Sequence, residues 1–475
     1  MSTAAFATLT LLGGFFLLMF LRVPVTFALL LATLGSALIN GTSLTTMVRM
    51  MIDGVSNFSL LAIPFFILMG EIMAAGKVSD KIIDLANLVV GRFRGGLAYV
   101  NVISSTFFGG ISGSAVADVS SLGSVVIPMM KKQGYDDEFS VGLTVTTACQ
   151  GVLIPPSHNM VIYALAAGGG VSIGHMFMAG AVPGIFLGFC FMVYCYISGK
   201  KYNFPMGLKI GPGDKIRWMK FTKSPTGTGW TSRKNETTWR ILTNPWFTCE
   251  MGKCIGVILN AILPMLTLLI IMVGVGAGVF TATESAAVAC VYAFLLTYAI
   301  FRSDKLSHFP QVLKNSLRTL ATVLTLIATA KAFAYMMTDL RIPAMITNGL
   351  VTISNNKYIL LLIINALLLV LGCFMDMAPL IMIMTPILLP VVTGPIINMN
   401  PVHFGVMLIF NLAIGLCTPP VGSALFVGCA VGHTSLERTS RKMLGLFGCM
   451  IFALMVVTFV PQVSLWFPTL IYGAA

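Results

Sequence analysis

Small and hydroxyl-bearing residues interrupt an apolar stretch, Gly109 to Pro128, and their chemistry is that of a cation site. The run Gly110-Ile-Ser112-Gly113-Ser114 offers serine hydroxyls and, where the helix unwinds, free backbone carbonyls. Such backbone groups are tolerated inside a membrane only where they are buried in protein or line a polar cavity. Sodium, like calcium and magnesium, is a hard cation that takes oxygen ligands. We therefore interpret Ser112, Gly113 and Ser114 as candidate sodium ligands.

The same kind of interruption recurs about half a chain later. The stretch Gly372 to Pro390 places Gly372, Asp376 and Pro379 in an apolar run. An ionisable residue inside an apolar span is costly and usually functional, so Gly372 and Asp376 are candidates for a second sodium site. The alternative for both sites is a pair of packing kinks whose hydroxyls bond back to the helix.

A double-proline motif follows each interruption. The first reads Gly151-Val-Leu-Ile-Pro-Pro-Ser157 and the second Gly415-Leu-Cys-Thr-Pro-Pro-Val-Gly422. The motifs are 264 positions apart, and Pro128 and Pro390 are 262 apart, which indicates an internal duplication. Interrupted apolar segments at matching places in two halves point to a transporter's binding site. On this basis we assign Thr418 and Gly422 to sodium, and Pro156, Ser157, Asn159, Pro420 and Ser423 to substrate; proline kinks for packing alone are the alternative.

Few other charged side chains lie in apolar segments. Asp118 follows the first interruption, and the alternative to a functional role there is a helix cap or a salt bridge to Lys131 or Arg94. Glu71 and Lys331 lie in two further segments, where each is either a ligand or a charge between domains. Because cations are scarce, half-helix N-termini with their backbone N–H groups are the expected binding groups for an anionic substrate.

These residues need a membrane scaffold to position them. The 475 residues are 57% hydrophobic and 9% charged, with a mean hydropathy of +0.92, whereas a soluble domain carries about 25% charged residues. A spanning helix needs about 20 apolar residues, and the apolar runs predict roughly ten to twelve membrane-embedded segments. The first run, Ala5 to Phe20, has no small-residue cleavage site after it, so we expect a retained span and not a signal peptide.

The predicted fold is an all-α polytopic membrane protein made of two inverted repeats. Each repeat is expected to contain a re-entrant hairpin, too short to cross the membrane, and a helix unwound in its middle. The predicted hairpin arms are Leu60 to Ala75 with Ile82 to Val90, and Leu324 to Met337 with Ile342 to Ile353. The first unwound helix is predicted to have halves at Leu97 to Phe108 and Ser124 to Met130. Other expected elements are a span at Val25 to Ile39, an interfacial helix at Thr42 to Asn57, a span at Ile255 to Val279, a capping box at Thr281 and Glu284, and a last span at Met443 to Val460.

Most of the net charge of +13 lies between the two halves. Residues 200–254 contain eleven Lys or Arg against three acids, and four of the five tryptophans, Trp218, Trp230, Trp239 and Trp246. Basic loops stay cytoplasmic, so we predict a cytoplasmic connector between halves 1–199 and 255–475 and no binding to nucleic acid. The tryptophans suit helices at the lipid headgroups or an interface with another subunit. The ten cysteines are scattered singly, as expected for buried thiols and not for disulfides or a zinc site.

Six motifs in order carry a family resemblance. They are PFFILMGEIM, GGISGSAVADVSSLGSVVIPMM, GVLIPPS, GVFTATE, GCFMDMAPLIMIMTPILLP and GLCTPPVG. Together they resemble the large membrane subunit, the M component or DctM-like subunit, of the tripartite ATP-independent periplasmic (TRAP) transporters. The resemblance covers about Ala5 to Lys201 and Ile255 to Phe467. Family members usually have proline at position 282, where this chain has Ala282. Met206 to Lys253 matches no motif of the family and is longer than the usual connector, so its role stays open.

The resemblance implies a sodium-coupled importer of organic acids in the bacterial inner membrane, with an elevator-type fold of the ion-transporter superfamily. It implies two partners, a small membrane subunit and a periplasmic binding protein, and no cofactor apart from the coupling sodium. Sialic acid, other sugar acids and C4-dicarboxylates all remain open as substrates. A stand-alone sodium/anion symporter of the same superfamily is the nearest alternative.

An intramembrane serine protease is the alternative from another class of protein. Gly110-Ile-Ser112-Gly113 matches a GxSG motif, and His158, His175 and His433 lie in or near later spans. A serine–histidine dyad does not require a second interruption without a serine nucleophile, so the duplication favours the transporter.

Overall fold

The computed structural model describes residues 3–91, 93–201, 204, 222–223, 230–231 and 247–473. Within these residues the fold is helical, apart from a two-residue antiparallel ladder of β1 (Thr222–Lys223) with β2 (Trp230–Thr231). Of the predicted connector, Lys200 and Lys201 belong to helix α10, and α12 begins at Phe247. Most of the rest of the connector, including Trp218, Trp239 and Trp246, lies outside the described residues.

The first three helices follow the predicted pattern. They are α1 (Thr3–Phe20), α2 (Val25–Asn40) and α3 (Leu44–Val55). Gly41 adopts the left-handed conformation that ends α2, and the Ser43 side chain caps α3 by accepting a hydrogen bond from the Thr45 N–H. The Ser36 hydroxyl of α2 donates to the Ala7 carbonyl of α1 over 2.9 Å, which fixes the two helices side by side.

The two predicted re-entrant hairpins turn where expected, but their first arms are longer than predicted. The 3₁₀ turn η1 (Phe58–Leu61) continues into α4 (Ala62–Ala75), and η3 (Leu306–His308) into α14 (Phe309–Asp339). Their partners are α5 (Val78–Val90) and α15 (Ile342–Ile353). By length and composition Phe58–Ala75 and Leu306–Asp339 are each long and apolar enough to cross a membrane, so the first arms exceed the predicted lengths.

The physical reason is that polar residues extend α14 instead of ending it. Thr322 and Thr325 donate their hydroxyls to carbonyls one turn earlier, those of Arg318 and Ala321. Hydroxyls satisfied in this way remain compatible with a helix. The chain turns only at Lys77 and Arg341, which both adopt positive φ.

The predicted unwound helices are pairs of separate helices. The first pair is α6 (Gly96–Ser112) with α7 (Ala115–Lys132), and the second is α16 (Lys357–Phe374) with α17 (Met377–Thr393). At about 1.5 Å per residue, either pair in a straight line would exceed the bilayer's hydrocarbon core of about 30 Å. The breaks are also shorter than predicted: only Gly113 and Ser114 lie between α6 and α7, so Gly110 and Ser112 are helical.

The double-proline motifs interrupt two further helices, as the sequence predicted. One is divided into α8 (Asp137–Gly151) and α9 (His158–Ala166), the other into α18 (Pro401–Cys417) and α19 (Ser423–Gly432). The Pro155–Pro156 and Pro419–Pro420 peptide bonds are both cis. The remaining elements are α10 (Ile173–Lys201), α12 (Phe247–Gly276), α13 (Ala282–Phe294), η2 (Leu295–Ile300), α20 (Leu436–Lys442), α21 (Leu444–Phe459) and α22 (Gln462–Tyr472). The predicted capping box at Thr281 and Glu284 begins α13.

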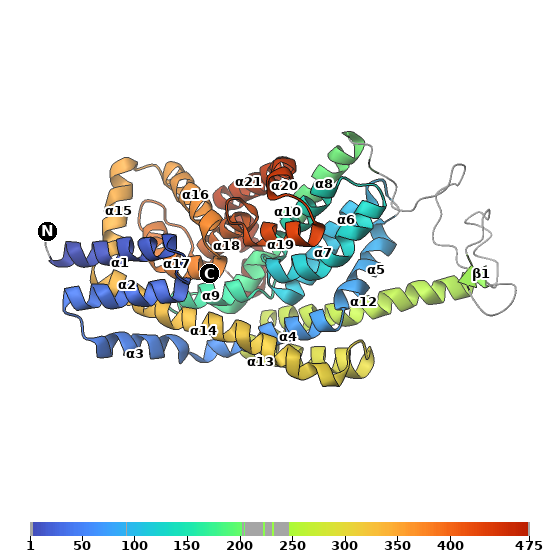
Figure 1. Ribbon diagram of the computed structural model, residues 1–475, viewed down its shortest axis with the longest axis horizontal. Helices are drawn as coiled ribbons and strands as arrows, with labels where there is room; N and C mark the ends of the chain where they lie inside the picture. The colour runs from blue at the N-terminus through green and yellow to red at the C-terminus, as the bar shows by residue number, and fades with distance from the viewer. Residues whose placement is uncertain are drawn as a thin grey trace.

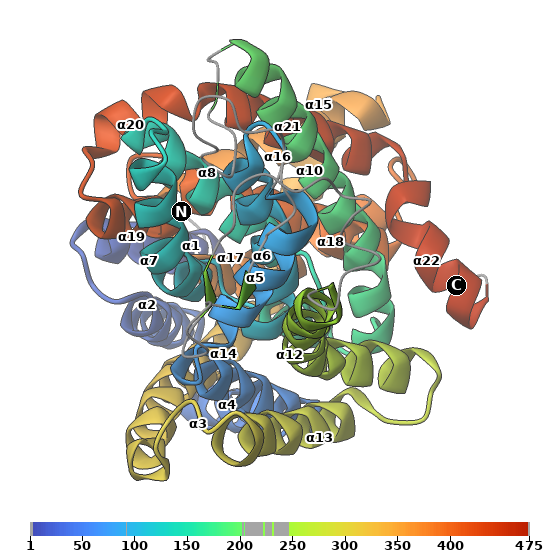
Figure 2. The same ribbon diagram turned by 90° about the vertical axis from the view of Figure 1, so that its right-hand side faces the viewer.

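Helices α8 and α18 form the centre of the molecule. Every residue from Phe139 to Gly151 and from Val402 to Cys417 is buried, as expected for helices that are covered on all sides. Both α6 and α7 pack against α8, while α16 and α17 pack against α18. Across the halves, α7 packs against α19 and α17 against α9 (Figures 1 and 2). Matched elements of the two halves therefore hold each other's broken helices.

Seven of the described helical stretches are long and apolar enough to span a membrane. They are Thr3–Phe20, Phe58–Ala75, Ile173–Lys201, Gly256–Gly276, Ala282–Ile300, Leu306–Asp339 and Lys357–Phe374. The pair α20 and α21, bent by 57°, makes an eighth, and four shorter apolar helices add to them. This is a multi-pass membrane protein, as the composition predicted.

Candidate functional site

Hydrogen bonds between buried polar side chains hold α6 against α8 and α16 against α18. Between α6 and α8, Asn101 donates to Thr144 over 2.7 Å and Gln150 donates to Thr106 over 2.6 Å. Between α16 and α18, the Asn411 amide donates to the Asn365 side chain over 2.8 Å. Satisfied polar groups inside an apolar core specify one arrangement of the helices. They set the register that brings the breaks together.

Glycines allow this close approach at both breaks. A Cβ atom added at Gly109 would lie 2.2 Å from the Cα of Gly151, and one added at Gly415 would lie 2.6 Å from the Cα of Gly372. Real Cβ atoms do not come this close to backbone atoms. The sequence motifs contain Gly151, Gly372 and Gly415 but do not show which backbone each one contacts. The contacting glycines of each pair are about 40 positions apart in the sequence.

The first break gathers oxygen atoms around Asp118. Its side chain is 1% exposed, and the Ser112 hydroxyl donates a short hydrogen bond to its Oδ1. Its Oδ2 has no hydrogen-bond partner and lies 2.7 Å from where a Cβ of Gly151 would be. Both alternatives for Asp118 were wrong: it caps no helix, and Lys131 instead bonds to Asp137 and to the Gly432 carbonyl. Asp118 therefore lies at the first break and is a further candidate residue there.

The double-proline break of the same half supplies further oxygens. A Cβ at Gly110 would lie 2.8 Å from the Pro155 carbonyl oxygen, and one at Gly113 would lie 3.3 Å from that of Pro156. Ser157 is buried and its hydroxyl has no hydrogen-bond partner. Asn159 is also buried, one turn into α9. The structure thus brings the Gly113 break next to the Pro155–Pro156 break of the same half.

The second break gathers a similar but more open set. Asp376 is exposed and caps α17, accepting a hydrogen bond from the Met377 N–H over 3.1 Å. The Ser423 hydroxyl lies beside this carboxylate without a well-formed hydrogen bond. The Val421 N–H donates to the Cys373 carbonyl over 3.2 Å, which ties the end of α16 to the Pro419–Pro420 break. Gly372 itself is helical and serves the close approach to Gly415.

Backbone carbonyls also converge at the second break. A Cβ at Gly422 would lie 2.9 Å from the Thr418 carbonyl oxygen and 3.3 Å from that of Leu416. The Thr418 hydroxyl donates back to the Ile414 carbonyl over 2.8 Å, so its proton is already used. Pro420 is exposed at the edge of this break. The thiol of Cys149 in α8 contacts that of Cys417 in α18, just before the two breaks, so the two sets are adjacent.

These donor sets fit a small hard cation. Each offers one carboxylate, at least one hydroxyl and carbonyl oxygens released from a helix. Carbonyls of this kind coordinate sodium in transporters with discontinuous helices. The unpartnered Oδ2 of Asp118 and hydroxyl of Ser157 are buried acceptors that a cation would satisfy. Among the described residues no group of three or more His, Cys, Asp or Glu side chains could hold a transition metal.

The geometry does not support the protease alternative. Ser112 bonds to Asp118 and Ser114, not to a histidine. The Nδ1 of His158 lies 3.3 Å from where a Cβ of Gly113 would be, and the Ser112 hydroxyl has no hydrogen bond to it. Glu71 forms no ion pair in the part of the chain that the structure describes.

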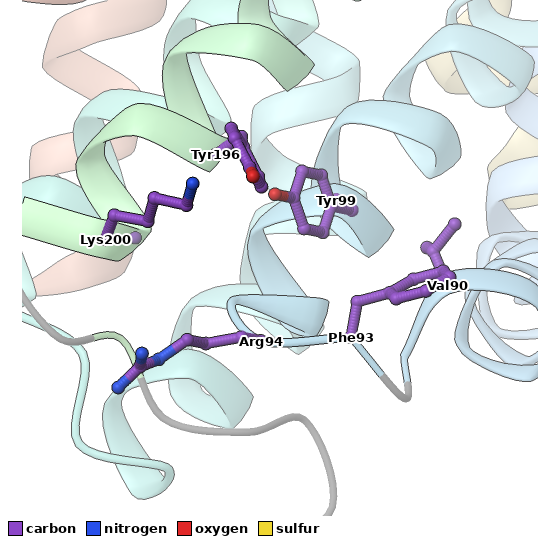
Figure 3. Close-up of a pocket in the computed structure, with 7 residues that line it drawn as sticks. Val90, Phe93, Arg94, Tyr99, Tyr196 and Lys200 are labelled. Atoms are coloured by element: carbon purple, nitrogen blue, oxygen red, sulfur yellow. The ribbon is translucent and has the colours of Figure 1, made fainter.

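A separate cavity of about 450 Å³ lies at the connector end of α10. Figure 3 shows the hydroxyls of Tyr99 and Tyr196 directed toward each other, with the Lys200 amine beside them. Arg94 points away and donates to the Phe204 carbonyl over 3.4 Å. Tyrosine and basic residues at the end of a span are typical of a membrane–water interface. None of the break residues is in its lining, which consists of Val90, Phe93, Arg94, Tyr99, Tyr196, Gly199 and Lys200.

The fold and the paired breaks define a multi-pass membrane protein of transporter architecture. Residues 12–463 match the family described as "Tripartite ATP-independent periplasmic transporter, DctM component". The chain belongs to this family, and it is therefore a secondary transporter and not an enzyme.

Two relatives and one solved structure illustrate the likeness. The chain is 33% identical to the sialic acid TRAP transporter large permease protein SiaM of Vibrio cholerae, covering 97% of this chain and 98% of that protein. It is 33% identical to the C4-dicarboxylate TRAP transporter large permease protein DctM of the same organism, over 88% and 87% of the two chains. The fold is similar to the crystal structure of the Alcanivorax borkumensis YdaH transporter, with a TM-score of 0.52, 11% identity and coverage of 88% and 89%.

Proposed function

We propose that this chain is the permease subunit of a sodium-coupled importer of small organic acids in the bacterial inner membrane. A periplasmic binding protein delivers the substrate, and a small membrane subunit completes the complex. The observation that carries the proposal is the pair of oxygen clusters at matched helix breaks, one around Asp118 and one around Asp376. A carboxylate in an apolar segment is stable when a cation compensates its charge, which links transport to sodium.

The relatives' names support an organic anion as substrate. One is a permease for sialic acid and another for C4-dicarboxylates, and both ligands carry carboxylates. The breaks supply N-termini of half-helices, at α9 and α19, whose free N–H groups favour an anion. Movement of the two breaks across the bilayer as one body, in an elevator mechanism, suits helices that pack across the two halves.

The first prediction concerns the partners. Proteoliposomes that contain this chain, a small membrane subunit and an inward sodium gradient should take up the acid only when its binding protein is present. Uptake should stop when the gradient is dissipated with a sodium ionophore. Rapid uptake by this chain alone would contradict the tripartite assembly and favour a stand-alone symporter.

The second prediction concerns Asp376. The change Asp376→Asn keeps the side chain's size and its cap on α17, but it removes the charge that a bound sodium would balance. Losing about 1.4 kcal/mol of ion affinity shifts the half-saturating sodium concentration about tenfold, and this is the shift we expect. The measurement is initial uptake rate against sodium concentration, with complex assembly checked by size-exclusion chromatography.

An unchanged sodium dependence in well-assembled Asp376→Asn would make this residue a helix cap only. The second ion would then depend on the carbonyl oxygens of Leu416 and Thr418 around Gly422.

A further inference from the structure

Two opposite charges, Lys331 and Asp53, are exposed on neighbouring helices and are not used by the helix breaks. Lys331 of α14 and Asp53 of α3 line one cavity of about 350 Å³, a size typical of small-molecule sites. Figures 1 and 2 show α14 between α3 and α17, and residues of α9 and α17 form the opposite wall. Asn57 and Thr338 add polar groups to the lining.

Close packing of α3 on α14 fixes the stem of Lys331. A Cβ at Gly54 would lie 2.9 Å from the Lys331 Cβ and 3.4 Å from the Ile327 carbonyl oxygen, so only glycine leaves room for this stem. Neither Lys331 nor Asp53 forms an ion pair within 4.0 Å among the described residues. A cation inside an apolar span that faces a cavity marks a substrate or ion path.

The other polar groups of this cavity have defined hydrogen-bonding capacity. The side-chain oxygen Oδ1 of Asn57 accepts a hydrogen bond from the Ser59 N–H over 2.9 Å, which leaves the side-chain NH₂ group free to donate. The Thr338 hydroxyl donates to the Ala334 carbonyl over 2.9 Å, which leaves its oxygen free to accept. The lining therefore includes one cationic donor, Lys331, and one anionic acceptor, Asp53, with neutral polar groups from Asn57, Thr338 and Tyr335.

The cavity adjoins a route from one membrane face. A second cavity, of about 460 Å³, shares Asn57 and Leu165 with it and is also lined by Ile173 and His175 at the start of α10. Helix α10 has 29 residues, about 43 Å at 1.5 Å per residue. The outer cavity therefore lies at the end of α10 opposite to Lys200 and the basic connector, which is the periplasmic end when the connector is cytoplasmic.

We infer that the Lys331 cavity binds a hydroxylated acid with a single carboxylate, of the sugar-acid type, before it reaches the helix breaks. Lys331 binds the carboxylate, and Asp53, Asn57 and Thr338 bind hydroxyl groups. A dicarboxylate fits poorly, because the only cation can neutralise one carboxylate while Asp53 repels the other. This inference rests on the proposed function, and it narrows the substrate class.

Protection of an introduced thiol tests the inference without a sodium gradient. In the permease–small subunit complex, Thr338→Cys is labelled with a fluorescent maleimide in the presence of D-glucuronate or of succinate. D-glucuronate should slow the labelling about tenfold and succinate should have little effect, because hydrogen bonds to charged groups contribute enough affinity for such a difference. The control thiol is Ile353→Cys, which is exposed on α15 outside the cavity, and neither acid should affect it.

Charge variants then test the role of Lys331. Lys331→Met in the Thr338→Cys background should abolish protection by D-glucuronate, Lys331→Arg should retain it, and Asp53→Asn should increase protection by succinate. Equal protection by both acids, protection by neither, or unchanged protection in Lys331→Met would overturn the inference. Should Lys331→Met not assemble, the comparison of the two acids and the Asp53→Asn variant still decide. Uptake without sodium dependence would refute the proposed function while leaving this result intact.

Discussion

Replacing Asp118 by asparagine is expected to raise the half-saturating sodium concentration of uptake about a hundredfold, which corresponds to about 2.8 kcal/mol of ion affinity. Asp118 is 1% exposed, and only one of its oxygens has a hydrogen-bond partner, the Ser112 hydroxyl. A buried carboxylate with an unsatisfied oxygen costs several kcal/mol unless a cation compensates it. The carboxamide keeps the size and can still accept from Ser112, but it brings no negative charge to the ion.

The measurement is uptake rate against sodium concentration in reconstituted complexes. Asp84→Asn is the matched control, because it makes the same chemical change on the exposed side of α5 and should leave the sodium dependence unchanged. Ser112→Ala should raise the sodium requirement by a smaller factor, because it removes one oxygen and no charge. A sodium curve of Asp118→Asn that matches the parent's would show that Asp118 serves the packing of α7 on α8 only.

Replacing Gly415 by alanine is expected to lower the free energy of unfolding by about 3 kcal/mol, the upper end of the usual cost of overpacking. A Cβ there would lie 2.6 Å from the Cα and carbonyl carbon of Gly372 and 2.7 Å from its oxygen. These are backbone atoms of a helix that both α17 and α18 hold in place, so no side chain can move away. The two helices would separate, and the second break would lose its shape.

Thermal unfolding of the purified complex measures this effect, with the yield of monodisperse protein as a second readout. Gly448→Ala is the control, because a Cβ at that position on α21 meets no atom within 4 Å. The control should be neutral or slightly stabilising, since glycine in a helix costs about 0.5–1 kcal/mol relative to alanine. Equal melting curves for Gly415→Ala and Gly448→Ala would mean that α16 and α18 are not held in backbone contact.

The sequence by itself determined the class of protein, the family and the approximate positions of the four helix breaks. The low charge and the long apolar runs predict that most of the chain is embedded in a membrane. Glycine tolerates positive φ and proline lacks an N–H group, so Gly113 and the double-proline motifs indicate interruptions without knowledge of any neighbour. The common offset of these motifs also predicted an internal duplication from the sequence alone.

The lengths of the helices and the composition of the site depended on the tertiary structure. Serine, threonine and asparagine are compatible with a loop or a helix, so the sequence did not show that α14 extends from Phe309 to Asp339. The Ser112–Asp118 bond, the contact of Gly109 with Gly151 and the cavity shared by Asp53 and Lys331 join residues on different helices. Apolar periodicity constrains which face of a helix is buried but not which helix covers it, and only the packing of α6 and α7 on α8 and of α3 on α14 decided these partners.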